Sequence, residues 1–398
     1  MVTEQITRTE KKTVLLLALC QALAATGKTI LFTIAALIGY SLTKDKSLAT
    51  VPLALVYLAN MSATIPASLL MKRCGRRLGF TIGTCIGVVG ASLGIFAIFY
   101  NSFPLFCLAT FLYGVFDGFA GFYRFAAADA ASDVFRSRAV SFVMAGGIMA
   151  AFCGPILAIW SKDLFKSAHF AGSLASIAGL LLLTLVVLQF IFIPQPSAVE
   201  RKKSGRTLTK IIRQPIFVVA AMGSMICYGI MTMLMTATPL AMVTHSHSFE
   251  NAAFVIQWHT LGMFVPSFFT GYLIRRFGVL NMILCGVTLN LLCIAINLTG
   301  TGFLHFWIAL LLLGVGWNFM FVGSTVLLTK VYSPGEKSKA QATHDFLMYG
   351  FITIIVSSSG GLLNKFDWQG VNYVSIPILL LMLPAIFWLR RSKELALT

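Results

Sequence analysis

Charged side chains are scarce in this sequence, and acidic ones most of all. Asp and Glu number 13 in 398 residues, and all charged residues together make up 11%, where a soluble domain has about 25%. So few polar side chains cannot cover a surface that faces water. This excludes a soluble enzyme, a disordered chain and a secreted module. With 58% hydrophobic residues, the composition favours an all-α, polytopic membrane protein.

Metal-binding and catalytic motifs are missing as well. No Cys-x-x-Cys pair occurs among the eight cysteines, so neither a disulfide framework nor a metal site is indicated. His245 and His247 form a lone His-x-His pair, which is a poor metal signal without further ligands. We find no nucleotide-binding loop and no Gly-x-Ser-x-Gly, His-Glu-x-x-His or paired-Asp motif. We therefore expect no cofactor and no enzymatic activity.

Long apolar stretches dominate what is present. A membrane-spanning helix needs about 20 predominantly apolar residues. We count twelve such stretches, at 14–39, 51–71, 78–100, 104–128, 139–160, 170–193, 216–243, 251–274, 280–299, 303–329, 340–362 and 370–389. The first is too long for a signal peptide, whose apolar region has about 7–15 residues, so we interpret it as a retained span.

Basic residues lie mainly on one side of these spans. The N-terminus and every second loop contain 23 Lys and Arg, whereas the opposite loops contain 5. The positive-inside rule then places both termini in the cytoplasm. Because the net charge of +17 is concentrated in short loops, we attribute it to the lipid bilayer and not to nucleic acid. We expect a monomer in a bacterial inner membrane.

The longest connection divides the spans into six and six. We predict an N-terminal six-helix bundle at 1–193, a basic cytoplasmic linker at 194–215 and a C-terminal six-helix bundle at 216–398. Residues 112–119 align with 312–319, and four of the eight positions are identical. The basic loops that follow also agree in register. These similarities indicate two pseudo-symmetric halves, and parallel repeats place a binding site at the repeat interface near the midplane.

Two loops contain related motifs. Residues 68–77 read SLLMKRCGRR, and residues 271–278 read GYLIRRFG. Together with the twelve spans and the similar halves, they resemble the major facilitator superfamily, whose pattern is roughly G-x-L-x-D-R-x-G-R-R. The matching positions that we take as candidate gating residues are Arg73, Gly75, Arg76 and Arg77 in the first loop, and Arg276 and Gly278 in the second.

The resemblance implies the fold of that superfamily and a gating role for these loops. In the family the acidic residue of the motif helps to latch the cytoplasmic gate, but Lys72 and Arg275 replace it here, which puts that latch in question. A tight turn at each glycine with cationic anchors would account for the same residues. Segments 123–129 and 257–271 resemble a mostly uncharacterised bacterial subgroup that includes a riboflavin transporter, from which we transfer no substrate.

Ionisable residues inside spans are costly and are therefore functional candidates. Lys28 lies near the middle of the first span and Asp117 near the middle of the fourth. At 1.5 Å per residue they lie about 21 and 16 Å from their cytoplasmic helix ends, so they are at similar depths. They form either a structural bridge or a pair that exchanges partners during transport.

A polar stripe extends along the fourth span. Gly114, Asp117, Gly121 and Arg124 have 3-4-3 spacing, which places them on one face of a helix. Such a face suits a polar cavity or a close neighbouring helix. Arg124 either lines that face or pairs with an acidic residue near the inner end, for which the candidates are Asp129 and Asp133.

The second half offers neutral or titratable groups inside its spans. Gln257 and His259 lie on the eighth span, and Trp317 and Asn318 on the tenth. His259 is interpreted either as a proton site or as a neutral histidine in the packing. Trp317, like Trp258, would serve to stack a planar substrate or to fill the core.

These features favour a secondary carrier that moves a small organic solute by alternating access, with proton coupling through titratable groups. The net positive lining of the first half favours an anionic or planar solute over a lipophilic cation. An efflux antiporter for drugs or metabolites, or a receptor without transport, are the alternatives. A membrane-embedded enzyme would require clustered catalytic groups, and the sequence contains none of the motifs sought.

Overall fold

The structure is a computed structural model that describes residues 8–132, 135, 139, 142–191, 193, 206–333 and 336–392. All regular structure within these residues is helical, and they contain no strand. Most of the predicted linker (194–205) and much of the basic loop at 133–138 lie outside the described residues, so their expected roles stay predictions.

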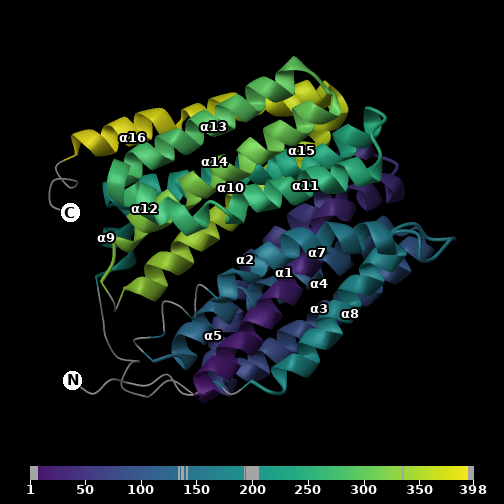
Figure 1. Cartoon of the computed structure of the whole chain (residues 1–398), viewed down its shortest axis with the longest axis horizontal. Coiled ribbons are helices and arrows are strands. Elements are labelled where there is room, and N and C mark those ends of the chain that lie inside the picture. The colour runs from purple at the N-terminus through teal and green to yellow at the C-terminus, as the bar shows by residue number, and fades with distance from the viewer. Residues whose placement is uncertain are drawn as a thin grey trace. The chain divides into compact units, whose positions relative to one another are not determined.

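The chain divides into two compact units, each made of helices that pack side by side (Figure 1). Unit 1 comprises Met1–Lys44 and Val51–Arg201, and unit 2 comprises Asp45–Thr50 and Lys202–Thr398. The helices of unit 1 are α1 (Arg8–Leu42), α2 (Val51–Cys74), α3 (Arg76–Phe99), α4 (Phe103–Ala120), α5 (Tyr123–Ala130), α7 (Gly146–Ser161) and α8 (Ala171–Leu188). Those of unit 2 are η1 (Lys46–Leu48), α9 (Leu208–Ile212), α10 (Pro215–Thr244), α11 (Phe249–Phe264), α12 (Ser267–Phe277), α13 (Val279–Thr299), α14 (Phe303–Thr329), α15 (Lys337–Leu380) and α16 (Met382–Arg391).

The described residues contain ten helices that are long and apolar enough to cross a membrane, or eleven if a bent pair is one span. The pair is α11 and α12, which meet at 45° around Pro266. Proline lacks a backbone N–H and its ring crowds the preceding turn, which breaks a helix. The predicted single span at 251–274 is therefore a broken one.

One stretch, Lys339–Arg391, is too long for a single crossing. Its 53 residues would extend about 80 Å as one helix, against about 30 Å of hydrocarbon. Asp367, with φ 58° and ψ −171°, interrupts it, between the predicted spans at 340–362 and 370–389. If this stretch is divided at Asp367, the eleven segments of the described residues become twelve, the number predicted from the sequence.

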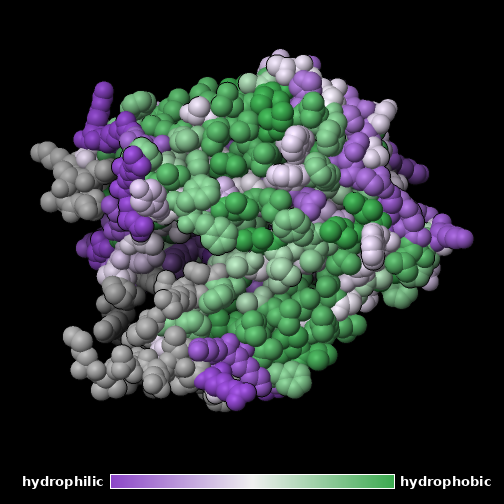
Figure 2. All heavy atoms as spheres, in the orientation of Figure 1, coloured by the Kyte–Doolittle hydropathy of each residue, from purple (hydrophilic) through white to green (hydrophobic). Residues whose placement is uncertain are grey.

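Large apolar side chains cover the flanks of the helices. Trp160 is 80% exposed and Phe268 76% exposed, and Figure 2 shows hydrophobic residues along the helices with hydrophilic ones gathered near their ends. A contiguous apolar surface of this kind is unstable in water. It fits helices whose flanks face lipid.

Glycines at corresponding positions of the two halves allow close helix crossings. A Cβ on Gly114 of α4 would lie 2.8 Å from Ala59 Cβ of α2, and one on Gly314 of α14 would lie 3.0 Å from Met263 N of α11. These two positions are 200 residues apart, which is the offset of the sequence repeat. In unit 1 the close crossing holds α4, the helix of Asp117, against α2. In unit 2 it holds α14, the helix of Asn318, against α11.

Candidate functional site

Unit 1 contains a charged pair between two helices. Lys28 Nζ on α1 lies 2.7 Å from Asp117 Oδ2 on α4, and the two side chains are 25% and 13% exposed. The contact agrees with the similar depths calculated from the sequence. Loss of either partner would leave the other charge poorly solvated, which is strongly unfavourable away from water.

A third residue, Asn60 on α2, joins this pair. Asn60 Nδ2 donates to Asp117 Oδ2 over 2.7 Å, and the residue is only 4% exposed. Sequence reasoning missed Asn60 because only charged residues were considered in the first half. The available signal was a strongly polar amide in the middle of an apolar stretch. Three helices thus converge on one carboxylate.

The predicted polar stripe crosses a short turn within one membrane-spanning segment, Phe103–Ala127. The helix α4 ends at Ala120 and α5 begins at Tyr123, but Gly121 and Phe122 keep right-handed helical dihedral angles. The Arg124 guanidinium lies over the Phe125 ring at 4.8 Å, and its buried Nε has no hydrogen-bond partner within the described part of the chain. The Asp129 carboxylate pairs with Arg76, and the described residues show no ion pair between Asp129 and Arg124. Asp133 lies outside the described residues.

The motif loop of unit 1 forms polar contacts near helix ends. Arg76 pairs with Asp129 at the end of α5, and Arg77 Nη2 donates to Gln189 Oε1 over 2.8 Å just after α8. Gly75 has a φ of 86°, which an L residue adopts only with strain. The loop therefore joins three helices around a turn that requires glycine, while Arg73 is exposed.

The motif loop of unit 2 repeats that turn. Gly278, between α12 and α13, has a φ of 85°, and a Cβ added there would meet no neighbouring atom within 4 Å. Arg276 is exposed and its guanidinium lies over the Phe277 ring at 5.4 Å. The tight-turn interpretation of both motifs fits these dihedral angles, whereas a gating role stays a prediction.

His259 of α11 is fully buried and faces α14. Its Nδ1 lies 2.8 Å from the carbonyl oxygen of Leu310, and its Nε2 is buried without a hydrogen-bond partner in the described part of the chain. Since a carbonyl only accepts hydrogen bonds, Nδ1 must bear the proton. A second proton on Nε2 would bury an unpaired charge, so the geometry favours a neutral histidine that joins two helices.

Asn318 of α14 supports the break between α11 and α12. Its Nδ2 donates to the carbonyl oxygen of Met263 over 2.7 Å and to Ser267 Oγ over 2.6 Å, and its Oδ1 accepts from Thr270 Oγ1 over 2.6 Å. A buried amide with these bonds has little capacity left for a ligand. Gln257, two to three turns before the break, is partly exposed.

An aromatic cluster surrounds Trp317. Its ring stacks on Phe321 at 4.8 Å and meets the edge of Tyr228 from α10 at 5.4 Å. Trp317 is 6% exposed, and its Nε1 is buried without a hydrogen-bond partner among the described residues. Trp258, by contrast, packs edge-on against Trp307 at 5.6 Å. The Trp317 cluster is the better candidate for stacking a planar ligand.

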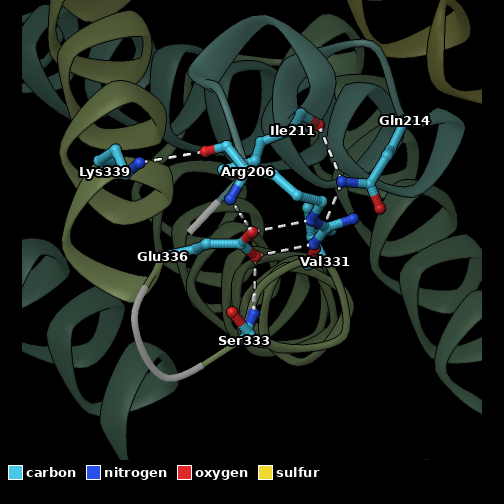
Figure 3. Close-up of polar contacts among 7 residues, drawn as sticks. All are labelled: Arg206, Ile211, Gln214, Val331, Ser333, Glu336 and Lys339. Atoms are coloured by element: carbon cyan, nitrogen blue, oxygen red, sulfur yellow. Dashed lines mark hydrogen bonds and ion pairs between the residues drawn. The ribbon is translucent and has the colours of Figure 1, made fainter. Parts of the chain in front are cut away.

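A second polar cluster lies outside the spans, where the linker enters unit 2 (Figure 3). Arg206 Nε and Nη2 each donate to the Glu336 carboxylate over 2.8 Å, and the Arg206 backbone N–H donates to it over 2.6 Å. The backbone N–H of Ser333 adds a fourth bond at 3.0 Å. Together they form what we call the linker clamp, Arg206, Ser333 and Glu336, which ties the start of unit 2 to the α14–α15 loop.

The described residues contain no group of three or more His, Cys, Asp or Glu that could hold a metal ion. The His-x-His pair is bound to protein carbonyls instead. His245 Nδ1 lies 2.8 Å from the Ala241 oxygen, and His247 Nε2 lies 2.8 Å from the Thr301 oxygen. The pair is therefore occupied in anchoring its own loop.

Comparison with known proteins assigns this architecture to a family. The family model described as Major Facilitator Superfamily matches residues 17–256 and 220–397. The chain is 40% identical over 377 residues to the riboflavin transporter RfnT of Brucella anthropi, covering 94% of each chain. It is 28% identical to the uncharacterised MFS-type transporter YdeG of Bacillus subtilis, over 96% of this chain and 92% of that protein.

Solved structures agree on the fold. The nucleoside transporter NupG superposes with a TM-score of 0.69 at 15% identity, over 97% of this chain and 100% of that chain. An auto-inhibited POT family peptide transporter gives 0.70 at 12% identity, over 96% and 97% of the two chains. At such low identities the likeness describes the fold alone.

Proposed function

The chain belongs to the major facilitator superfamily, and from this premise we propose that it is a proton-coupled carrier of a small planar organic solute of the riboflavin class. Its relatives are named as transporters, so the chain is a multi-pass membrane transporter; substrate and coupling are the proposal. The relation to transporters also agrees with the expectation of a carrier and not an enzyme.

The Lys28–Asp117 pair is the observation on which the proposal rests. Placing a carboxylate and an ammonium group 2.7 Å apart among apolar helices costs free energy. Ionisable residues at such positions therefore usually serve a function. Uptake of a proton by Asp117 would remove the attraction for Lys28. The released ammonium would then bind an electron-rich group of the solute, such as a carbonyl oxygen or a ring nitrogen.

The aromatic cluster of unit 2 supports the planar class of substrate. Tyr228, Trp317 and Phe321 pack against one another, and aromatic faces bind planar rings by stacking. The unpaired Trp317 Nε1, buried among the described residues, adds a donor. Riboflavin has a planar ring system with carbonyl groups, so both features suit a solute of its kind.

Transport of radiolabelled riboflavin into proteoliposomes with an imposed pH gradient tests the proposal. We expect accumulation of riboflavin that collapses when the gradient is dissipated. Lys28→Ala should abolish binding, because the solute loses its cationic partner. Asp117→Asn should still bind but should lose gradient-driven accumulation.

Three outcomes would contradict parts of this scheme. If the protein bound cationic solutes more tightly than anionic or neutral planar solutes of similar size, Lys28 could not be the group that binds the solute. Unchanged accumulation in Asp117→Asn would exclude Asp117 as the proton site. Export against the proton gradient, with no uptake, would favour the efflux antiporter that the sequence left open.

The orientation is part of the proposal. We place both termini and the linker in the cytoplasm and the carrier, as a monomer, in a bacterial inner membrane. The charge asymmetry of 23 against 5 basic residues between the two sets of loops supports this orientation.

A further inference from the structure

Asp117 accepts two hydrogen bonds on the same oxygen. Lys28 Nζ and Asn60 Nδ2 each lie 2.7 Å from Asp117 Oδ2. The other oxygen, Oδ1, has no hydrogen bond within the described part of the chain and is not fully buried. One oxygen of the carboxyl group is therefore occupied and the other is accessible.

The two donors respond differently to the charge of Asp117. The ammonium of Lys28 is attracted to the carboxylate by charge, and this attraction disappears when the acid is neutral. The amide of Asn60 is uncharged and can donate either to a carboxylate oxygen or to the carbonyl oxygen of a carboxylic acid. Protonation of Asp117 therefore weakens the Lys28 contact much more than the Asn60 hydrogen bond.

The backbone of Asn60 is also fixed by close packing. A Cβ on Gly118 of α4 would lie 3.3 Å from the Asn60 carbonyl oxygen and 3.0 Å from Ala63 Cβ. The nearby crossing at Gly114 brings the same two helices together. Asn60 is 4% exposed, whereas the side chain of Lys28 is 25% exposed.

We propose that Asn60 is a positioning residue that holds Asp117 Oδ2 in place through the transport cycle and leaves Oδ1 to take the coupling proton. A proton from water bonds to Oδ1, and Oδ2 becomes the carbonyl oxygen that still accepts from Asn60. Lys28 keeps its own three protons and turns to the solute. The inference rests on the proton coupling proposed above and adds the residue that keeps the carboxyl group oriented.

Few other ionisable groups approach this site. The helix α1 contributes Lys28, α2 contributes Tyr57 one turn from Asn60, and α4 itself contributes Tyr113, whose hydroxyl is 3.5 Å from the Ala24 oxygen. Beyond its first two arginines, α3 has only the exposed Cys85. Among these groups, Asp117 is the carboxyl group that both Lys28 and Asn60 contact.

Asn60→Ser tests the inference in proteoliposomes, since serine fits the space but is too short to reach Oδ2. We expect pH-gradient-driven accumulation of riboflavin to fall about tenfold, the scale of one hydrogen bond to a charged group. Riboflavin exchange without net proton movement, and binding in detergent, should stay within about threefold. A merely structural loss would lower all three together.

Thr64→Val is the matched control, because it removes a hydrogen bond of similar length one turn along α2. Thr64 Oγ1 donates over 2.8 Å to the Asn60 carbonyl oxygen and not to Asp117, so all three measurements should match the wild type. Asn60→Leu, which also lacks the donor, is a second variant should Asn60→Ser not insert.

Infrared difference spectra supply an independent signature. The carboxylic acid C=O band that Asp117→Asn removes should move to higher frequency in Asn60→Ser, because a carbonyl released from a hydrogen bond vibrates faster. An unshifted band, or normal accumulation in both Asn60 variants, would overturn the role of Asn60 alone. Failure of the wild type to accumulate riboflavin under a pH gradient would overturn the proposed coupling and this inference with it.

Discussion

Single residues inside the spans divide into a charged group that responds to protons and neutral groups that join helices. His259 belongs to the second kind, because its Nδ1 binds the Leu310 oxygen and its ring is fully buried. We expect His259→Asn, whose amide also donates, to leave the pH dependence of uptake unchanged. Asp117→Asn, measured beside it, should flatten that dependence. Uptake against pH in proteoliposomes makes the comparison.

The complementary substitution His259→Leu removes the hydrogen bond between α11 and α14. We expect it to destabilise the protein by about 1–3 kcal/mol, as for other buried bonds, and to leave the pH dependence intact in the protein that folds. Loss of gradient-driven accumulation in a well-folded His259→Asn would instead assign a coupling proton to this histidine.

The sequence identifies charged residues better than their neutral partners. Lys28 and Asp117 are conspicuous because a charge within an apolar helix is rare, and helical rise alone gives their depth. In the sequence, Asn60 and Asn318 do not differ from other polar residues. Tertiary packing places Asn60 against the Asp117 carboxylate and Asn318 against the break between α11 and α12. The contacts between residues depend on where the helices cross, and the crossing points cannot be predicted from the residue types alone.

At the scale of helices, we expect no side chain larger than hydrogen to fit at Gly114 or Gly314, where helices cross closely. Gly114→Ala and Gly314→Ala would force a methyl group against the backbone of α2 and α11, and overpacking of this kind costs about 1–3 kcal/mol. We expect both variants to lower the thermal midpoint in detergent. Light-scattering melts of the purified protein measure it.

Two other helical glycines serve as controls. Gly179 of α8 and Gly271 of α12 have no atom within 4 Å of the position that an added methyl group would take. Alanine there should be neutral or stabilising by about 0.5–1 kcal/mol, because glycine weakens a helix interior. Equal losses at all four glycines would contradict the assignment of the two crossings.

The linker clamp lies near the end of the linker, where Arg206 binds Glu336 in the loop between α14 and α15. Arg206 and the Ser333 backbone N–H bind the charged carboxylate of Glu336 and hold its pKa well below the usual range. The clamp should therefore stabilise unit 2 fully above the pKa of an unfolded glutamate, about 4.3, and lose this effect only as pH falls toward the lower folded value. We expect Glu336→Gln to lower the thermal midpoint by a similar amount across neutral and mildly acidic pH, and by less below about pH 4.

Asp163→Asn is the matched control for the clamp. Its carboxylate pairs with Lys162 and His169 but is 65% exposed, and exposed pairs contribute little. The thermal midpoint of this variant should stay close to that of the wild type at every pH. A Glu336→Gln protein with wild-type melting at neutral pH would show that the clamp adds no stability.

Helix boundaries follow from the sequence less well than helix number. Apolar runs predict where a membrane is crossed, yet the fourth stretch contains a break at Gly121 and Phe122, and the eighth a break at Pro266. Proline signals the second break. At the first, no residue type forbids a helix, and Gly121 and Phe122 accordingly keep right-handed helical dihedral angles. The motif glycines are the opposite case, since their positive φ follows from a turn that only glycine favours.

For the whole molecule, the asymmetry of basic loops predicts orientation. Lysine and arginine in short loops are retained on the cytoplasmic side during insertion, and loops of the set with 23 basic residues alternate with loops of the set with 5. A cysteine at Ser204, in the linker and outside the described residues, should therefore be inaccessible to an impermeant maleimide added to intact cells. The background must lack the eight native cysteines.

Ser167→Cys is the matched outside site in the same background. Ser167 is exposed between α7 and α8, in a loop of the opposite set, so it should label in intact cells, while Ser204→Cys should label only after the membrane is permeabilised. The reversed pattern would place the linker outside and invert the transporter. Because the cell fixes the direction of the proton gradient, a carrier that moves proton and solute together would still import the solute in either orientation. The two labelling reactions thus decide the orientation of the chain, while uptake in an imposed pH gradient decides the direction in which the solute moves.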